Sequence, residues 1–274
     1  MRGASTIADL GEKEGGSKEE RIAALRRAVD GLQSIPAGIL QPEHVTAGVG
    51  VSLAAGLPGP GLIGGVLNEV IAARGDQPAA FSFLFTLTAA ALQERPGPAV
   101  FVAAQRALEF GTPYGHGLNQ LGVDVGRLIL VDAETDKDAL WALEEALRSD
   151  AKPAILVGAI EADLDLTQSR RLNLAAATHA TPHVLSRGMK VAGTSAAATR
   201  WRITPAPAAR DRFDTFAYWR WHVTLERCRN GRTGAWLIEW NHAARRFRSV
   251  EDLPNRTRTV GGACHPRIDR LQSH

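Results

Sequence analysis

The turn after the first predicted buried strand is the place where this sequence would hold a phosphate. A strand predicted at residues 66–71 leads into Ala72-Ala73-Arg74-Gly75-Asp76-Gln77-Pro78-Ala79. In a phosphate loop, glycines let backbone N–H groups cradle the phosphate, a lysine offsets its charge and a hydroxyl binds Mg²⁺. The four positions that define the loop hold Ala72, Gln77, Pro78 and Ala79. Because Pro78 also lacks a backbone N–H, the sequence predicts no Mg-ATP hydrolysis at this turn.

Arginines are the second group of residues that could do chemistry. Residues 1–186 hold 15 Lys and Arg against 22 Asp and Glu, whereas residues 187–274 hold 17 against 7, and 16 of those 17 are Arg. The net charges of −7 and +10 indicate a polyanion or an acidic partner for the C-terminal part, or else a solvated arginine-rich surface. The candidates for DNA or partner binding are Arg170, Arg171, Arg187, Lys190, Arg200, Arg202, Arg227, Arg229, Arg245, Arg246 and Arg248.

Several of these candidates also have a purely structural explanation. Arg170 and Arg171 could contact phosphate, or they could pair with acidic residues at 161–165 or face solvent. Around Trp201, arginine forks could bind phosphate while the indole stacks on a base. In an alternating strand, however, Trp201 would face the core and its two neighbours would face solvent. The basic segment 245–248 could bind nucleic acid or an acidic patch, or could belong to a loose tail.

Other chemistries have little support in the sequence. The two cysteines, Cys228 and Cys264, fit a reducing compartment and exclude a disulfide scaffold or cysteine-rich zinc module. His179 and His183 are four residues apart, but Pro182 would break a helix between them, so we expect no metal site and no cofactor. There is no G-x-S-x-G elbow of a hydrolase. We find no apolar run of membrane-spanning length and no secretory signal at residues 1–21.

The elements that must position these residues follow from the apolar pattern. Strands are predicted at residues 66–71, 98–103, 127–131, 153–157 and 183–185, and helices at 79–92, 114–121, 138–147 and 166–178. This alternation predicts an α/β fold with a mostly parallel sheet flanked by helices, which binds ligands at the carboxyl ends of its strands. Alternating runs at 199–204, 219–227 and 235–240, with Asn230-Gly231 as a hairpin turn, predict antiparallel strands at the C-terminal edge.

The chain divides into three parts in this interpretation. Residues 1–49 form an N-terminal segment, partly disordered, with a short amphipathic helix at 18–33. Residues 50–248 form the α/β domain, and residues 249–274 are a basic, flexible tail.

Part of the chain resembles the RecA core. Residues 100–134 contain the intact Leu121-Gly122-Val123-Asp124, while VLNEVI at 66–71 and GLPGPGLIGG at 56–65 resemble the strand and lead-in before the RecA phosphate loop. In that register the water-polarising glutamate falls at Gln105, a nearby aspartate at Ala103 and the magnesium-associated aspartate at Gly158. The resemblance thus implies a RecA-like fold without ATPase activity. It also places Arg170, Arg171, Arg187 and Lys190 near DNA-binding loops, and Arg227 and Arg229 at a subunit-facing hairpin.

Four further segments look like the ImuA family, so that the resemblance covers residues 50–248. They are residues 138–147, 165–172, 195–202 and 236–240. Membership would imply a non-catalytic accessory factor of damage-induced translesion DNA synthesis, cytoplasmic and associated with the nucleoid. The implied partners are an ImuB-like polymerase-related protein, RecA and single-stranded DNA, with no membrane. The alternatives are a SulA-like cell-division inhibitor and a weak RecA-like ATPase.

Overall fold

The computed structural model describes residues 52–53, 57, 61–188, 195–229 and 233–253, with the side chains of 52–53 and 251–253 left aside. The predicted helix at 18–33, Lys190 and residues 254–274 lie outside this part of the chain.

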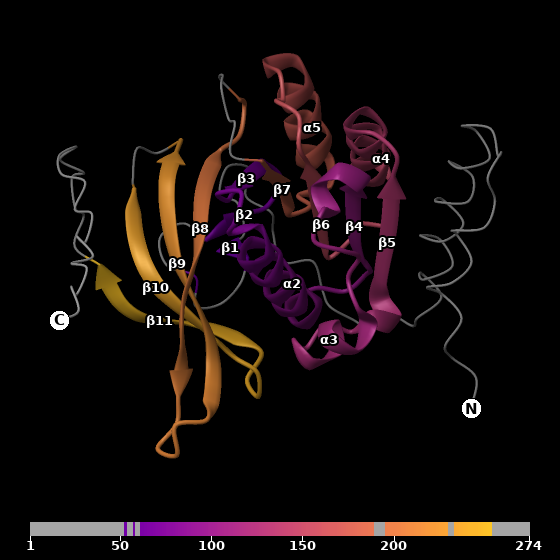
Figure 1. The fold of residues 1–274 in the computed structure, drawn as a ribbon. Helices are drawn as coiled ribbons and strands as arrows, with labels where there is room; N and C mark the ends of the chain where they lie inside the picture. The colour runs from indigo at the N-terminus through magenta and orange to yellow at the C-terminus, as the bar shows by residue number, and fades with distance from the viewer. Residues whose placement is uncertain (1–51, 54–56, 58–60, 189–194, 230–232, 254–274) are drawn as a thin grey trace, which may run out of the picture.

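A nine-stranded sheet in the order β11-β10-β9-β8-β3-β7-β6-β4-β5 organises the described residues (Figure 1). Its parallel strands are β3 (Leu67–Ile71), β4 (Ala99–Ala104), β5 (Leu128–Ala133), β6 (Ile155–Ile160) and β7 (His183–Arg187). Strand β8 (Thr199–Arg210) is parallel to β3, and β9 (Phe216–Cys228), β10 (Gly234–Asn241) and β11 (Arg246–Leu253) continue the sheet antiparallel. A small pair, β1 (Ser52–Leu53) and β2 (Leu62–Ile63), forms a separate sheet, and the backbone of Ile63 is hydrogen-bonded to the Asn68 side chain of β3. The predicted α/β class with antiparallel strands at the C-terminal edge is confirmed.

Helices cover both faces of the parallel strands, which explains their almost continuous apolar sequences. Strands β4 (AVFVAA) and β6 (ILVGAI) are buried along their whole length. Helix α2 (Gln77–Glu94) lies on one face, while α4 (Asp136–Arg148) and α5 (Leu166–His179) lie together on the other (Figure 1). A short helix α3 (Gly115–Gln120) and 3-10 turns at Gln105–Leu108 and Val125–Arg127 connect the strands.

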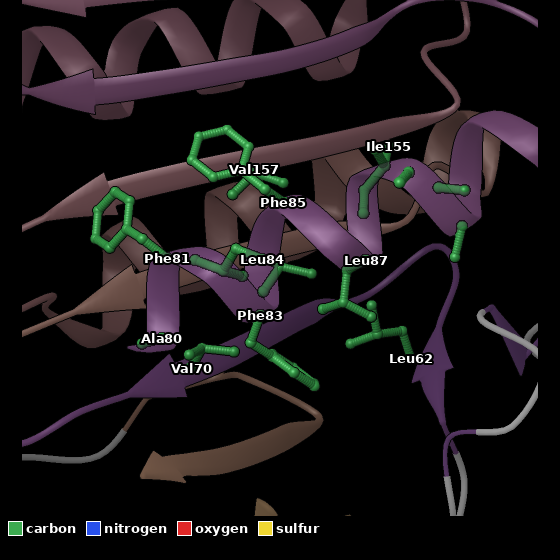
Figure 2. Close-up of a cluster of buried hydrophobic side chains, with 14 of the residues drawn as sticks. Leu62, Val70, Ala80, Phe81, Phe83, Leu84, Phe85, Leu87, Ile155 and Val157 are labelled. Atoms are coloured by element: carbon green, nitrogen blue, oxygen red, sulfur yellow. The ribbon is translucent and has the colours of Figure 1, made fainter. Parts of the chain in front are cut away.

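Helix α2 is apolar nearly all round because it packs against both halves of the sheet. In Figure 2, Phe81 and Phe85 point to one side of the helix and Phe83 to the other. The ring of Phe85 stacks 4.8 Å from that of Phe101 in β4, whereas the ring of Phe83 lies 5.7 Å from that of Trp221 in β9. The helix therefore joins the parallel and antiparallel strands through one core.

The helices on the opposite face begin with side-chain caps. The Thr135 hydroxyl accepts a hydrogen bond from the backbone N–H of Asp138 at the start of α4. Asp165 and Gln168 form a reciprocal capping box at the start of α5. These caps explain why both helices begin within two residues of the predicted positions.

Strand β11 is an addition that the sequence pattern did not predict. Its first residues belong to the basic segment 245–248, and Phe247 is the buried side chain among exposed neighbours. The Phe247 ring lies 4.9 Å from that of Trp240 in β10. This contact and the pairing with β10 explain why a polar sequence forms a strand here. Within the described residues, no helix is both long enough and apolar enough to span a membrane.

Candidate functional site

The turn between β3 and α2 closes on its own backbone. The N–H of Asp76 donates to the carbonyl of Ala73 at 2.9 Å, and the helix begins one residue later at Gln77. Ala72 is buried at the end of β3, while Pro78 is exposed in the first helical turn, where its ring is tolerated. The predicted degenerate loop thus lies directly before a helix N-terminus, the position that binds anions in many proteins.

An acidic side chain contacts the first residue of this helix. The side-chain amide of Gln77 donates to Oε1 of Glu161, which follows β6, at 3.0 Å. The pKa of Glu161 is raised, first by burial and then by the carboxylates of Glu109 and Asp136. Asp136 is fixed beside it, because its oxygens accept the backbone N–H groups of Glu161 and Ala162 at 3.1 and 2.8 Å. These acidic side chains would repel a phosphate at this corner.

The other degenerate positions lie near the same edge of the sheet. Ala103 is buried in β4, and Gln105 is exposed at the start of the 3-10 turn that follows it. Gly158 lies inside β6, which runs on to Ile160 beyond the predicted end at 157. A Cβ atom at Gly158 would stand 2.5 Å from Leu143 Cδ1 and 2.7 Å from Leu185 Cδ1. A side chain at position 158 would therefore have to displace the buried side chains of Leu143 and Leu185, and a carboxylate there would lie in the apolar core.

Beside the turn, the central strand carries a buried ionic cluster that sequence reasoning missed. Glu69 of β3 is fully buried, and its two oxygens contact Arg187 Nη1 of β7 at 2.9 Å and Arg200 Nη2 of β8 at 2.8 Å. Arg187 also reaches Asp163 at 3.5 Å and is 4% exposed. A glutamate inside the apolar strand VLNEVI was the feature of the sequence that could have indicated this cluster. Its pairing indicates that Arg187 and Arg200 hold β7 and β8 onto β3.

Other candidate arginines are also paired with glutamates. Arg171 contacts Glu144 of α4 at 2.6 Å, and Arg202 pairs with Glu226 across β8 and β9. Trp201, between Arg200 and Arg202, is 2% exposed and lies in the core.

A further glutamate binds two arginines across the last three strands. Buried Glu239 of β10 accepts from Arg220 of β9 at 3.0 Å and from Arg248 of β11 at 2.8 Å. The charges of Arg171, Arg202 and Arg248 are therefore at least partly neutralised where they lie.

Five candidates have no carboxylate partner among the residues described, and three of them, Arg170, Arg227 and Arg229, lie on α5 and at the end of β9. Arg227 donates to the Ser195 carbonyl at 3.1 Å and Arg229 donates to the Ala196 carbonyl at 3.2 Å. The N–H of Ala196 in turn donates to the hydroxyl of Ser169 at 3.0 Å, and exposed Arg170 follows Ser169 in α5. We call Arg170, Arg227 and Arg229 the α5–β9 arginine cluster.

The remaining candidates lie elsewhere. Arg245 adopts a positive φ of 47° in the turn before β11, and its side chain lies over Gly122. Arg246, exposed, opens β11. His179 ends α5 while His183 is buried in β7, and no three metal-ligating side chains come together in the described ranges.

The fold and this corner define an α/β protein with a mostly parallel sheet, in which an acidic side chain after β6 is hydrogen-bonded to the first residue of helix α2. The chain is 36% identical over 236 residues to Protein ImuA of Caulobacter vibrioides strain NA1000 / CB15N, which covers 79% of this chain and 93% of that protein. Protein ImuA of strain ATCC 19089 / CIP 103742 / CB 15 matches with the same figures. The chain belongs to the ImuA family. No protein-family model matches it.

Proposed function

We propose that this chain is a non-catalytic accessory factor in damage-induced translesion DNA synthesis, which acts by binding an ImuB-like polymerase-related protein. RecA and single-stranded DNA are the further partners in this proposal. Membership of the ImuA family supports the role in damage-induced mutagenesis. The observation that supports the non-catalytic part is the Gln77–Glu161 hydrogen bond of 3.0 Å, because a carboxylate held beside the first residue of α2 would disfavour a phosphate at that helix N-terminus.

In this proposal the domain is a RecA-like core that has lost its ATPase chemistry. Seven positions support the loss, namely Ala72, Gln77, Pro78, Ala79, Ala103, Gln105 and Gly158. We expect calorimetry with Mg-ATP to show no binding, and ATP hydrolysis to stay at the level of the buffer with or without single-stranded DNA. Hydrolysis that depends on DNA and disappears in Gln105→Ala would instead establish a RecA-like ATPase.

The partner is tested with purified full-length proteins and in cells. We expect the chain to form a complex with the ImuB-like protein of its own organism. We also expect its deletion to lower the frequency of damage-induced mutation without slowing growth in undamaged cells. Absence of the complex would contradict the proposal. Division arrest on overexpression, independent of the polymerase genes, would favour a division inhibitor instead.

A further inference from the structure

The outer half of the β8–β9 hairpin extends beyond the rest of the sheet (Figure 1). Strand β3 pairs with β8 only as far as Arg202, and β10 pairs with β9 only from Trp219 onward. The hairpin itself continues to the pair Arg210 and Phe216. Residues 207–218 therefore form a two-stranded ribbon without a third strand, an arrangement that contributes little stability by itself.

A defined turn nevertheless fixes the shape of the hairpin tip, residues 210–216. The Asp211 carboxylate accepts from the backbone N–H groups of Phe213 at 2.8 Å and Thr215 at 2.9 Å. The pKa of Asp211 is lowered, first by the side chain of Thr215 and then by these two backbone groups. Asp214 adopts a positive φ of 61°, and its carbonyl accepts from Arg210 at 2.7 Å. The backbone that carries the exposed side chains is therefore held in a hydrogen-bonded frame.

This frame presents aromatic side chains to solvent. Phe213, Phe216 and Trp219 are 69%, 51% and 44% exposed. The rings of Phe216 and Trp219 pack edge to face at 4.9 Å, and the Arg212 guanidinium lies 4.6 Å from the centre of the Phe213 ring. Beside them is a cavity of about 240 Å³ that is partly open to solvent and is lined by Pro207, Ala208, Arg210 and Phe216. Exposed aromatics and arginine around a cavity are the composition of a protein interface.

The charges at the tip distinguish between a protein and a nucleic acid as its occupant. Residues 210–214 contain two arginines and two aspartates, so they carry no net positive charge to attract phosphates. The Asp211 carboxylate accepts hydrogen bonds inside the turn, and the Asp214 carboxylate lies 3.4 Å from Arg210. Arg212 is left without a carboxylate partner in the described part of the chain, so it can bind an external one.

We propose that the hairpin tip is a docking site for a protein segment that carries a large apolar side chain next to a carboxylate. The apolar side chain would enter the cavity beside Phe216, and the carboxylate would pair with Arg212 over the Phe213 ring. This inference rests on the proposed function, in which the chain works by binding an ImuB-like protein, and it names the surface that does so.

The test compares two substitutions of equally exposed apolar residues in the full-length chain. Phe213→Ser alters the tip, and Leu174→Ser alters a side chain on α5 that is 71% exposed against 69% for Phe213. We expect calorimetry to give at least tenfold weaker binding of the purified ImuB-like protein for Phe213→Ser, and unchanged binding for Leu174→Ser. Arg212→Glu should weaken binding as well, because it would repel the partner's carboxylate. Circular dichroism should show that all three variants fold.

The outcomes separate the two proposals. Equal affinity of wild type and Phe213→Ser would overturn the docking site and leave the proposed function intact. Absence of binding by the wild-type chain would overturn both. If Phe213→Ser weakened binding of a single-stranded oligonucleotide and left binding of the ImuB-like protein unchanged, the tip would be a nucleic-acid site and the inference would be wrong.

Discussion

Glu69 shows how a single residue determines what its neighbours are available to do. Its carboxylate is fully buried in the central strand, where an ionised group requires close partners. Arg187 and Arg200 supply them from the strands on either side, at 2.9 and 2.8 Å. The two arginines therefore have a structural task, and the burial of Arg187 argues against a direct contact with DNA.

Replacing Glu69 by glutamine should strongly destabilise the protein. The change leaves the buried guanidinium of Arg187 without its main counter-ion, and breaking a buried pair in this way costs about 3–5 kcal/mol. Urea denaturation followed by circular dichroism would measure the loss. The matched control is Glu226→Gln, because the Arg202–Glu226 pair is about one-third exposed and such pairs contribute about 0–1 kcal/mol. Equal effects of the two changes would contradict this role of Glu69.

His183 should make stability depend on pH. Burial lowers its pKa from 6.5 to about 3, so the folded state stays neutral where the unfolded chain takes up a proton. Stability is therefore complete above pH 6.5 and falls as the pH drops from there toward 3, by roughly 1 kcal/mol per pH unit from this group. Neither ring nitrogen has a hydrogen-bond partner among the described residues, so His183→Leu should remove this dependence without losing a bond seen there. Urea midpoints at pH 7, 6 and 5 would measure the difference, and parallel slopes for both proteins would contradict it.

At the scale of elements, local patterns predicted the helices and parallel strands, because their apolar periodicity arises within a few residues. The length of β8 could not be predicted in the same way, since Pro205 and Pro207 indicate a strand end. Both prolines are tolerated because the pairing of β3 with β8 ends at Arg202. Beyond this residue, β8 needs no backbone N–H donor on the side that faced β3.

The site was less predictable than the elements. The partners of Glu69 lie 118 and 131 residues away in sequence, so no local pattern links them. The residue types of the turn predicted that it is degenerate. The Glu161 side chain that contacts Gln77, however, follows a different strand, β6. A carboxylate 84 residues from Gln77 joins it only because β6 and β3 both flank β7.

Gly158 gives a prediction about β6 as an element. Gly158→Asp should destabilise the protein and give no ATPase activity, because the new Cβ would stand 2.5 Å from Leu143 and 2.7 Å from Leu185. Overpacking of this kind costs about 1–3 kcal/mol, and a buried carboxylate without a partner adds to it. The control is Gln105→Glu, which restores the other catalytic residue type at an exposed position and should leave stability unchanged. Thermal unfolding of both variants checks the prediction, which a Gly158→Asp protein as stable as Gln105→Glu would contradict.

For the whole molecule, the structure refines the division of charge between the two parts of the sequence. The net charge of +10 for residues 187–274 overstates the free cations, because Arg187 and Arg200 share the carboxylate of Glu69 from the acidic part. Arg202 and Arg248 pair with glutamates of the same sheet. The α5–β9 arginine cluster is exposed and, in the part of the chain that the structure describes, is bonded to backbone carbonyls and to no carboxylate, so it is the better candidate for phosphate.

Single-stranded DNA should therefore distinguish free arginines from paired ones by the salt dependence of its binding. Each phosphate neutralised on a single strand contributes about −0.7 to the slope of log K against log salt, so three arginines of the cluster predict about −2. Arg227→Gln with Arg229→Gln should bring the slope close to about −0.7. Arg202→Gln with Arg248→Gln should leave it unchanged, because those charges face Glu226 and Glu239. Fluorescence anisotropy of a labelled oligonucleotide across a salt titration measures all three slopes. If only Arg202→Gln with Arg248→Gln reduced the slope, DNA binding would be assigned to strands β8–β11. If no binding were seen at low salt, protein contacts would remain as the means by which this chain acts.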